Sequence, residues 1–125
     1  MEYIVGVFTA VALAVFARVS RFEKDRSFYP TVLIVIGFLY VLFGAIDGRP
    51  SVLLMEGAFA LLFSAVALFG FRNSCRIVGF GIAAHGIFDF LHQFLIEDAG
   101  VPVWWPGFCG SVDVLLGVYV AVFVC

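Results

Sequence analysis

Five apolar segments dominate the chain, and short polar or proline-containing turns separate them. They run over residues 3–19, 30–46, 51–71, 76–96 and 107–125. A helix that crosses a bilayer needs about 20 apolar residues, with a range of about 17–25. Lipid offers the backbone no hydrogen-bond partners, so a spanning segment must be a helix or part of a closed barrel. The alternation of barrel strands is absent. The sequence therefore predicts an all-α polytopic bundle of five transmembrane helices, which form a single transmembrane domain over residues 1–125.

The composition agrees with lipid as the solvent of this chain. Hydrophobic residues make up 64% of the 125 residues and charged residues 13%, whereas soluble domains average about 45–50% and about 25%. A soluble core of this size cannot bury so much apolar surface. The net charge of −2 gives no reason to expect nucleic acid as a partner. We expect a multi-pass protein of the cell membrane with the lipid bilayer as its partner. Five short helices enclose little volume, which favours a homodimer.

The basic residues predict the orientation. In a five-helix arrangement only Arg49 falls on one side, and six basic residues fall on the other, namely Arg18, Arg21, Lys24, Arg26, Arg72 and Arg76. Cytoplasmic loops carry the excess of lysine and arginine. The first and third loops are therefore expected in the cytoplasm, with the N-terminus outside and the C-terminus cytoplasmic.

Glycine spacing indicates where helices approach closely. Small residues let membrane helices pack at short range, and a spacing of seven suits a left-handed crossing. Three pairs have this spacing: Gly37 and Gly44, Gly79 and Gly86, and Gly110 and Gly117. We expect these pairs to line the seams of the bundle.

The fourth segment carries three ionisable residues on one face. His85, Asp89 and His92 are four and then three residues apart, and such side chains project from the same side of a helix. An ionisable group at membrane depth costs roughly 2.5–3.5 kcal/mol on insertion scales. We therefore expect these side chains to face protein, water or a bound ion rather than lipid.

Other helices carry acidic residues at a similar depth. On a rise of about 1.5 Å per residue, Glu56 lies about 8 Å from the outer end of the third segment, and Asp113 about 8–10 Å from that of the fifth. His92, Asp89 and His85 lie about 7, 12 and 18 Å into the fourth. The inner half of the membrane has no comparable set. The sequence thus predicts an outward-facing His/Asp/Glu pocket.

Several neighbouring residues have simpler structural interpretations. Asp47 is expected to act as a turn or cap residue, Tyr40 as part of the core, and Cys109 in packing more often than as a metal ligand. Trp104 and Trp105 are typical of a membrane interface, and they are also placed to roof a pocket.

The cysteine pattern does not predict a disulfide. The chain has three cysteines, which is not an even set, and no CxxC pair. Cys75 and Cys125 are therefore expected to be small apolar packing residues.

Three chemistries fit the polar residues. A divalent metal (zinc, iron or manganese) suits a set drawn from His85, Asp89, His92 and Asp113. In metal-free acid–base catalysis, Asp89 or Asp113 stays protonated and donates, while His85 or His92 accepts and Glu56 is a charge partner. The third chemistry is a proton or ion path across the membrane. It is disfavoured because the inner half of the membrane-spanning region is largely apolar.

These chemistries lead to a preferred function and two alternatives. The preferred function is an enzyme that acts on a small lipophilic molecule, isoprenoid- or lipid-like, either as a cyclase or isomerase or as a metal-dependent hydrolase. Isoprenoid or lipid metabolism is then the expected setting. The first alternative is a small transporter, channel or metal-binding membrane protein, and the second is a structural or interaction protein.

Two motifs carry a resemblance to a family. They are His85-Gly86-x-x-Asp89-x-x-His92 and Gly100-Val101-Pro102-x-Trp104-Trp105-Pro106-x-Phe108-Cys109. Together with Arg26-Ser27-Phe28-Tyr29-Pro30, Gly70-Phe71-Arg72 and Asp113, they resemble an uncharacterised family of small microbial integral membrane proteins over residues 26–124. The resemblance implies kinship and a membrane location, and it implies no activity.

Overall fold

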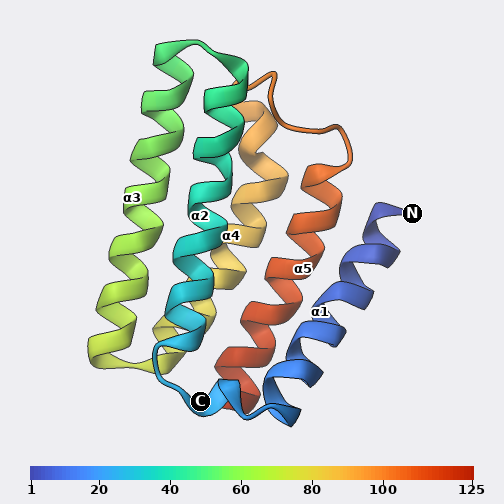
Figure 1. The fold of residues 1–125 in the computed structure, drawn as a ribbon, viewed down its shortest axis with the longest axis vertical. Helices are drawn as coiled ribbons and strands as arrows, with labels where there is room; N and C mark the ends of the chain where they lie inside the picture. The colour runs from blue at the N-terminus through green and yellow to red at the C-terminus, as the bar shows by residue number, and fades with distance from the viewer.

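The computed structural model describes all 125 residues as an all-α bundle (Figure 1). The main helices are α1 (Glu2–Val19), α2 (Phe28–Asp47), α3 (Pro50–Asn73), α4 (Cys75–Leu95) and α5 (Trp105–Tyr119). A short 3₁₀ helix η1 (Phe22–Lys24) precedes α2, and a π-helical turn η2 (Val120–Val124) continues α5. The five spans, with α5 and η2 taken together, are each long and apolar enough to cross a membrane. The predicted fold class is confirmed.

The helices alternate in direction, so the connections gather at two ends of the bundle (Figure 1). We call the end with the N-terminus, the α2–α3 turn and the α4–α5 loop the upper end, and the opposite end the lower end. The lower end holds residues 20–27, Ser74 and Cys125. The six basic residues named above belong to segments at the lower end, and Arg49 lies at the upper end. Which end faces the cytoplasm remains a prediction.

Proline and glycine set the ends of α2 and α3. The second apolar segment was predicted to begin at residue 30, but α2 begins at Phe28, so Pro30 lies in its first turn. A proline is tolerated there because the first N–H groups of a helix have no intrahelical partner. Pro50 is the first residue of α3. Gly48 ends α2 with a φ of 89°, a conformation that residues with a Cβ rarely adopt.

The seven-residue glycine pairs lie at helix seams, as predicted. A Cβ on Gly44 would lie 3.3 Å from the Cα of Leu53, so this part of α2 is held close to α3. A Cβ on Gly86 would lie 2.7 Å from the backbone nitrogen of Val114, and one on Gly79 would lie 2.6 Å from that of Ala121. The α4–α5 seam is therefore a backbone-to-backbone contact that leaves no room for a methyl group.

We predict that Gly86→Ala destabilises the bundle by about 1–3 kcal/mol, because α4 and α5 must move apart to admit the methyl group. The measurement is thermal unfolding of the purified protein in detergent. Gly57→Ala in α3 is the matched control, since nothing lies within 4 Å of the Cβ position there. Equal stability of the two variants would contradict the close seam.

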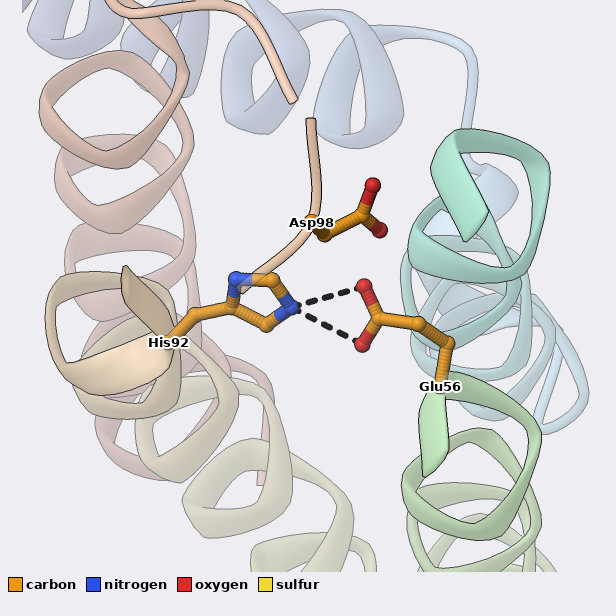
Figure 2. Close-up of side chains that lie close together, drawn as sticks. All are labelled: Glu56, His92 and Asp98. Atoms are coloured by element: carbon orange, nitrogen blue, oxygen red, sulfur yellow. Dashed lines mark hydrogen bonds and ion pairs between the residues drawn. The ribbon is translucent and has the colours of Figure 1, made fainter. Parts of the chain in front are cut away.

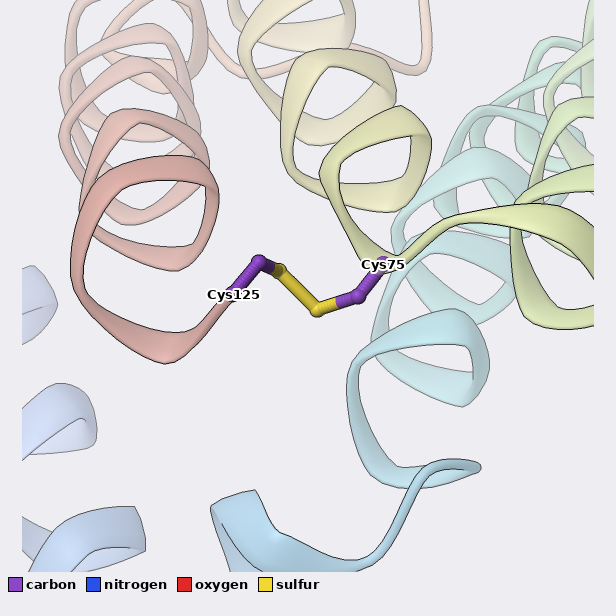
Figure 3. The surroundings of a disulfide bond; sticks show 2 residues. All are labelled: Cys75 and Cys125. Carbon is purple, nitrogen blue, oxygen red and sulfur yellow. A yellow bond between two sulfur atoms is a disulfide. The ribbon is translucent and has the colours of Figure 1, made fainter.

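The prediction for two of the cysteines is wrong. Cys75 and Cys125 form a disulfide, although they are 50 residues apart in sequence (Figure 3). Their Cα atoms lie 5.7 Å apart, which is within the usual range for such a bond. The physical reason is topological: α4 starts at the lower end, and η2 ends there. Cys109 is the remaining free cysteine, and it is buried.

Candidate functional site

Three ionisable side chains meet at the α4–α5 seam. Asp113 of α5 faces His85, and its Oδ2 lies 2.9 Å from the His85 Nδ1. One turn further along α4, the Oδ2 of Asp89 lies 3.5 Å from the same nitrogen. All three residues are at most 2% exposed. We call His85, Asp89 and Asp113 the inner triad.

Tyr40 of α2 connects the inner triad to His92. Its hydroxyl donates a hydrogen bond to the Oδ1 of Asp89 at 2.6 Å. Its ring stacks on the imidazole of His92, with 4.0 Å between the centroids. Tyr40 therefore holds one carboxylate oxygen of Asp89, and the other oxygen is left facing His85.

A second group of three lies nearer the upper end. The Nε2 of His92 in α4 lies 2.8 Å from both carboxylate oxygens of Glu56 in α3. Asp98, from the loop that follows α4, places its carboxyl group beside this pair (Figure 2). Its Oδ1 accepts a hydrogen bond from the Gly100 N–H at 2.9 Å. Glu56 and His92 are buried and Asp98 is half-buried. We call these three residues the outer triad.

Each triad brings three candidate metal ligands together. One side-chain nitrogen and two carboxylate oxygens lie within 4.8 Å of one another in each. An ion about 2.0–2.2 Å from three such atoms in tetrahedral geometry would hold them roughly 3.3–3.6 Å apart. The distances of 2.9 and 3.5 Å from the His85 Nδ1 to its two carboxylate oxygens fit this spacing after small adjustments.

Three buried atoms of the triads lack a hydrogen-bond partner. They are the Nε2 of His85, the Oδ2 of Asp89 and the Oδ2 of Asp98. Buried polar atoms are normally paired, because an unpaired one costs about 1–3 kcal/mol. Both triads thus keep an oxygen available to a further group.

The five site residues predicted from the sequence are brought together in these triads. Glu56, His85, Asp89, His92 and Asp113 are all buried, and they come from three helices. The predicted clustering of buried His, Asp and Glu side chains is confirmed, but it takes the form of two groups rather than one pocket, and their role as a site remains a prediction. None of the four main surface hollows is lined by any of these residues, so the opening of this region to the outside remains a prediction.

The neighbouring residues divide between structural roles and contact with the site. Cys109 is buried but belongs to neither triad. Trp104 is 51% exposed, as suits an interface residue. Trp105 packs edge-on against Phe43 and Tyr40, with centroid distances of 4.7 and 6.5 Å, and so covers the site from above.

Sequence reasoning missed Asp98 and placed Tyr40 in the core. Tyr40 is indeed 1% exposed, but its hydroxyl belongs to the site. Asp98 follows the end of α4, and no helical spacing relates it to Glu56. Only the path of the loop brings it back over α3 and α4, so no sequence signal was available for it.

Asp47 fixes this loop, beyond its expected role in the turn. Its carboxylate accepts hydrogen bonds from the Arg49 side chain at 2.8 and 3.0 Å and from the Ala99 N–H at 2.7 Å. Arg49 in turn donates to the Glu97 carbonyl at 2.6 Å. The α2–α3 turn therefore holds the loop that carries Asp98.

Comparison with known proteins identifies no relative: no family model, curated protein or solved structure matches this chain. Membership of the family suggested by the two motifs therefore remains a prediction. The findings support a polytopic helical membrane protein with buried His/Asp/Glu clusters.

We predict that Glu56→Ala destabilises the protein by about 3–5 kcal/mol, because it leaves His92 without its buried partner. His92→Ala should have a similar effect, and the double variant should cost clearly less than the sum of the two. Denaturant unfolding in detergent measures these differences. Glu97→Ala is the control, since this side chain is exposed. Additive effects would rule out coupling between Glu56 and His92.

We expect Asp47→Ala to loosen the loop over residues 96–104. Loss of the hydrogen bond from the Ala99 N–H should destabilise the closed loop by about 1 kcal/mol. The Ala99 amide should therefore exchange roughly fivefold faster. Hydrogen–deuterium exchange read by mass spectrometry tests this. Asp25→Ala removes an exposed aspartate whose hydrogen bonds are local, and it should leave the loop unchanged. Unaltered exchange in Asp47→Ala would refute the clamp.

Proposed function

We propose that this protein is a membrane-embedded enzyme that acts on a small lipophilic molecule, isoprenoid- or lipid-like, at a divalent metal bound by the inner triad. One observation carries the proposal: His85, Asp89 and Asp113 present three ligand atoms within 4.8 Å of one another in a buried, intramembrane position. Ionisable residues at this depth are costly and commonly functional.

The number and type of ligands favour a catalytic site over a structural one. Structural zinc sites have four protein ligands, whereas catalytic sites have three and keep a position for water or substrate. An imidazole with two carboxylates suits zinc, iron or manganese. When bound, such an ion would polarise a substrate oxygen or make a bound water acidic.

The surrounding residues support a preorganised site. Tyr40 fixes Asp89 through its hydrogen bond, the kind of support that keeps a ligating carboxylate oriented. Phe63 packs edge-on against His85 at a centroid distance of 4.6 Å. With Trp105 and Phe43 above it, the inner triad has apolar and aromatic surroundings, which suit a lipophilic substrate and restrict water.

In this proposal the outer triad transfers protons between the inner triad and the solvent at the upper end. Asp98 is half-buried and close to Glu56 and His92, and His92 stacks on Tyr40, which contacts the inner triad. In this proposal His92 is the base and Glu56 its charge partner. If the lower end is cytoplasmic, as the basic residues predict, the site faces outward.

The first test is metal binding by protein purified in detergent. We expect about one zinc, manganese or iron(II) ion per chain at the inner triad after loading, measured by elemental mass spectrometry. His85→Ala and Asp113→Ala should lose this ion. Tyr40→Phe keeps all three ligands and should retain it. No uptake of any of the three metals would refute the metal centre.

A hydrogen-bonded chain favours a second candidate, metal-free acid–base catalysis. Tyr40 donates to Asp89, and His85 and Asp113 form a pair at 2.9 Å, so protons are already shared among these groups. Incubation with isoprenoid or lipid fractions, with turnover measured by mass spectrometry, distinguishes the metal-dependent mechanism from the metal-free one. Turnover that survives chelation and is lost in Asp113→Asn supports the second candidate. No turnover in any fraction, with or without metal, argues against both.

A further inference from the structure

The lower end of the bundle contains a cavity that neither triad uses. Its volume is about 450 Å³, and its wall includes both half-cystines, Cys75 and Cys125. Both residues are exposed to solvent, and Figure 3 shows the disulfide that joins them. The cavity thus places an accessible sulfur–sulfur bond beside space for a small molecule.

Unpaired positive charge lines the same cavity. Lys24 and Arg26 are exposed and form no ion pair. Arg26 donates to the Phe71 carbonyl at 2.6 Å, which holds its guanidinium at the cavity wall. The acidic residues there are already engaged: Glu23 pairs with Arg18 at 2.9 Å, and Asp25 accepts two hydrogen bonds from Ser27. The hydrogen bonds from Ser27 lower the pKa of Asp25. The positive charges therefore remain available to an anionic guest.

A buried polar group also lines this cavity. Tyr29 is 3% exposed, and its hydroxyl has no hydrogen-bond partner. Buried hydroxyl groups are normally paired. Tyr29 therefore lines the cavity with the hydrogen-bonding capacity of its hydroxyl unused.

We propose that this cavity is a thiol–disulfide exchange site for an anionic low-molecular-weight thiol, with Cys75–Cys125 as the exchanging bond. Lys24 and Arg26 would hold the carboxylates of the thiol. The basic residues predict that the lower end is cytoplasmic, and exposed disulfides in that compartment are exchanged by small thiols. This inference is independent of the function proposed for the triads.

The exchange balances in two steps. The thiolate of the first small molecule attacks the Sγ of Cys125, the sulfur–sulfur bond breaks, and its electron pair leaves with the Sγ of Cys75. Cys75 is the first residue of α4, where the positive end of the helix dipole favours a thiolate. The thiolate of a second small molecule attacks the small-molecule sulfur of the mixed disulfide, this sulfur–sulfur bond breaks, and its electron pair leaves with the Sγ of Cys125. Two electrons and two protons reach the cysteines, and the small molecules leave as their own disulfide.

The experiment follows reduction of the bond in the full-length protein in lipid nanodiscs, where both ends are accessible. Differential alkylation and peptide mass spectrometry report Cys75 and Cys125 separately from Cys109. The probes are glutathione, which is anionic, and 2-mercaptoethanol, which is neutral. We expect Lys24→Gln or Arg26→Gln to slow reduction by glutathione about three- to tenfold and to leave the mercaptoethanol rate unchanged, as expected for electrostatic attraction.

Arg21→Gln is the matched control, because Arg21 is a basic residue of the same loop that does not line the cavity. It should leave the glutathione rate within twofold of the wild-type rate, an effect far smaller than that of the cavity residues. Equal slowing of both thiols, or equal effects of all three substitutions, would overturn recognition by the cavity. Failure of Cys75 and Cys125 to pair after exposure to oxidised glutathione would overturn the exchange site itself.

Discussion

Pairing of ionisable side chains across helix seams is the constraint on which this bundle depends. His85 has its partner on α5, and His92 has its partner on α3. Lipid cannot solvate such groups, so each has to find its partner on a neighbouring helix. The two contacts fix the rotation of α4 relative to α3 and α5. Asp89 is held in the same way by Tyr40, which adds α2 to the set.

Close backbone packing makes these contacts geometrically attainable. The glycines of α4 and α5 let the two backbones meet near Gly86 and Val114, one residue from both His85 and Asp113. A wider seam would separate the imidazole from the carboxylate. The small residues therefore determine the distance between the helices, and the ionisable residues form contacts that require this short distance.

The two ends of the bundle differ in chemistry. The upper end has the Asp47 clamp, Trp105 and the outer triad, which together close over the inner triad. The lower end has the basic loop, the disulfide and the cavity beside it. The chain has an odd number of spans, which places the N-terminus and Cys125 at opposite ends (Figure 1).

The sequence by itself determined the five helices, because apolar length and the hydrogen-bonding demand of the backbone leave a membrane chain no other structure. It also predicted that Glu56, His85, Asp89, His92 and Asp113 share one half of the bundle, since the helical rise converts residue number into height. Depth does not determine direction around a helix axis, so the division into two triads and the inclusion of Tyr40 came only from packing. Asp98 and the Cys75–Cys125 bond depend on where a loop and a chain end lie in space. Local spacing carries no information about such distant contacts, and only the tertiary structure decided them.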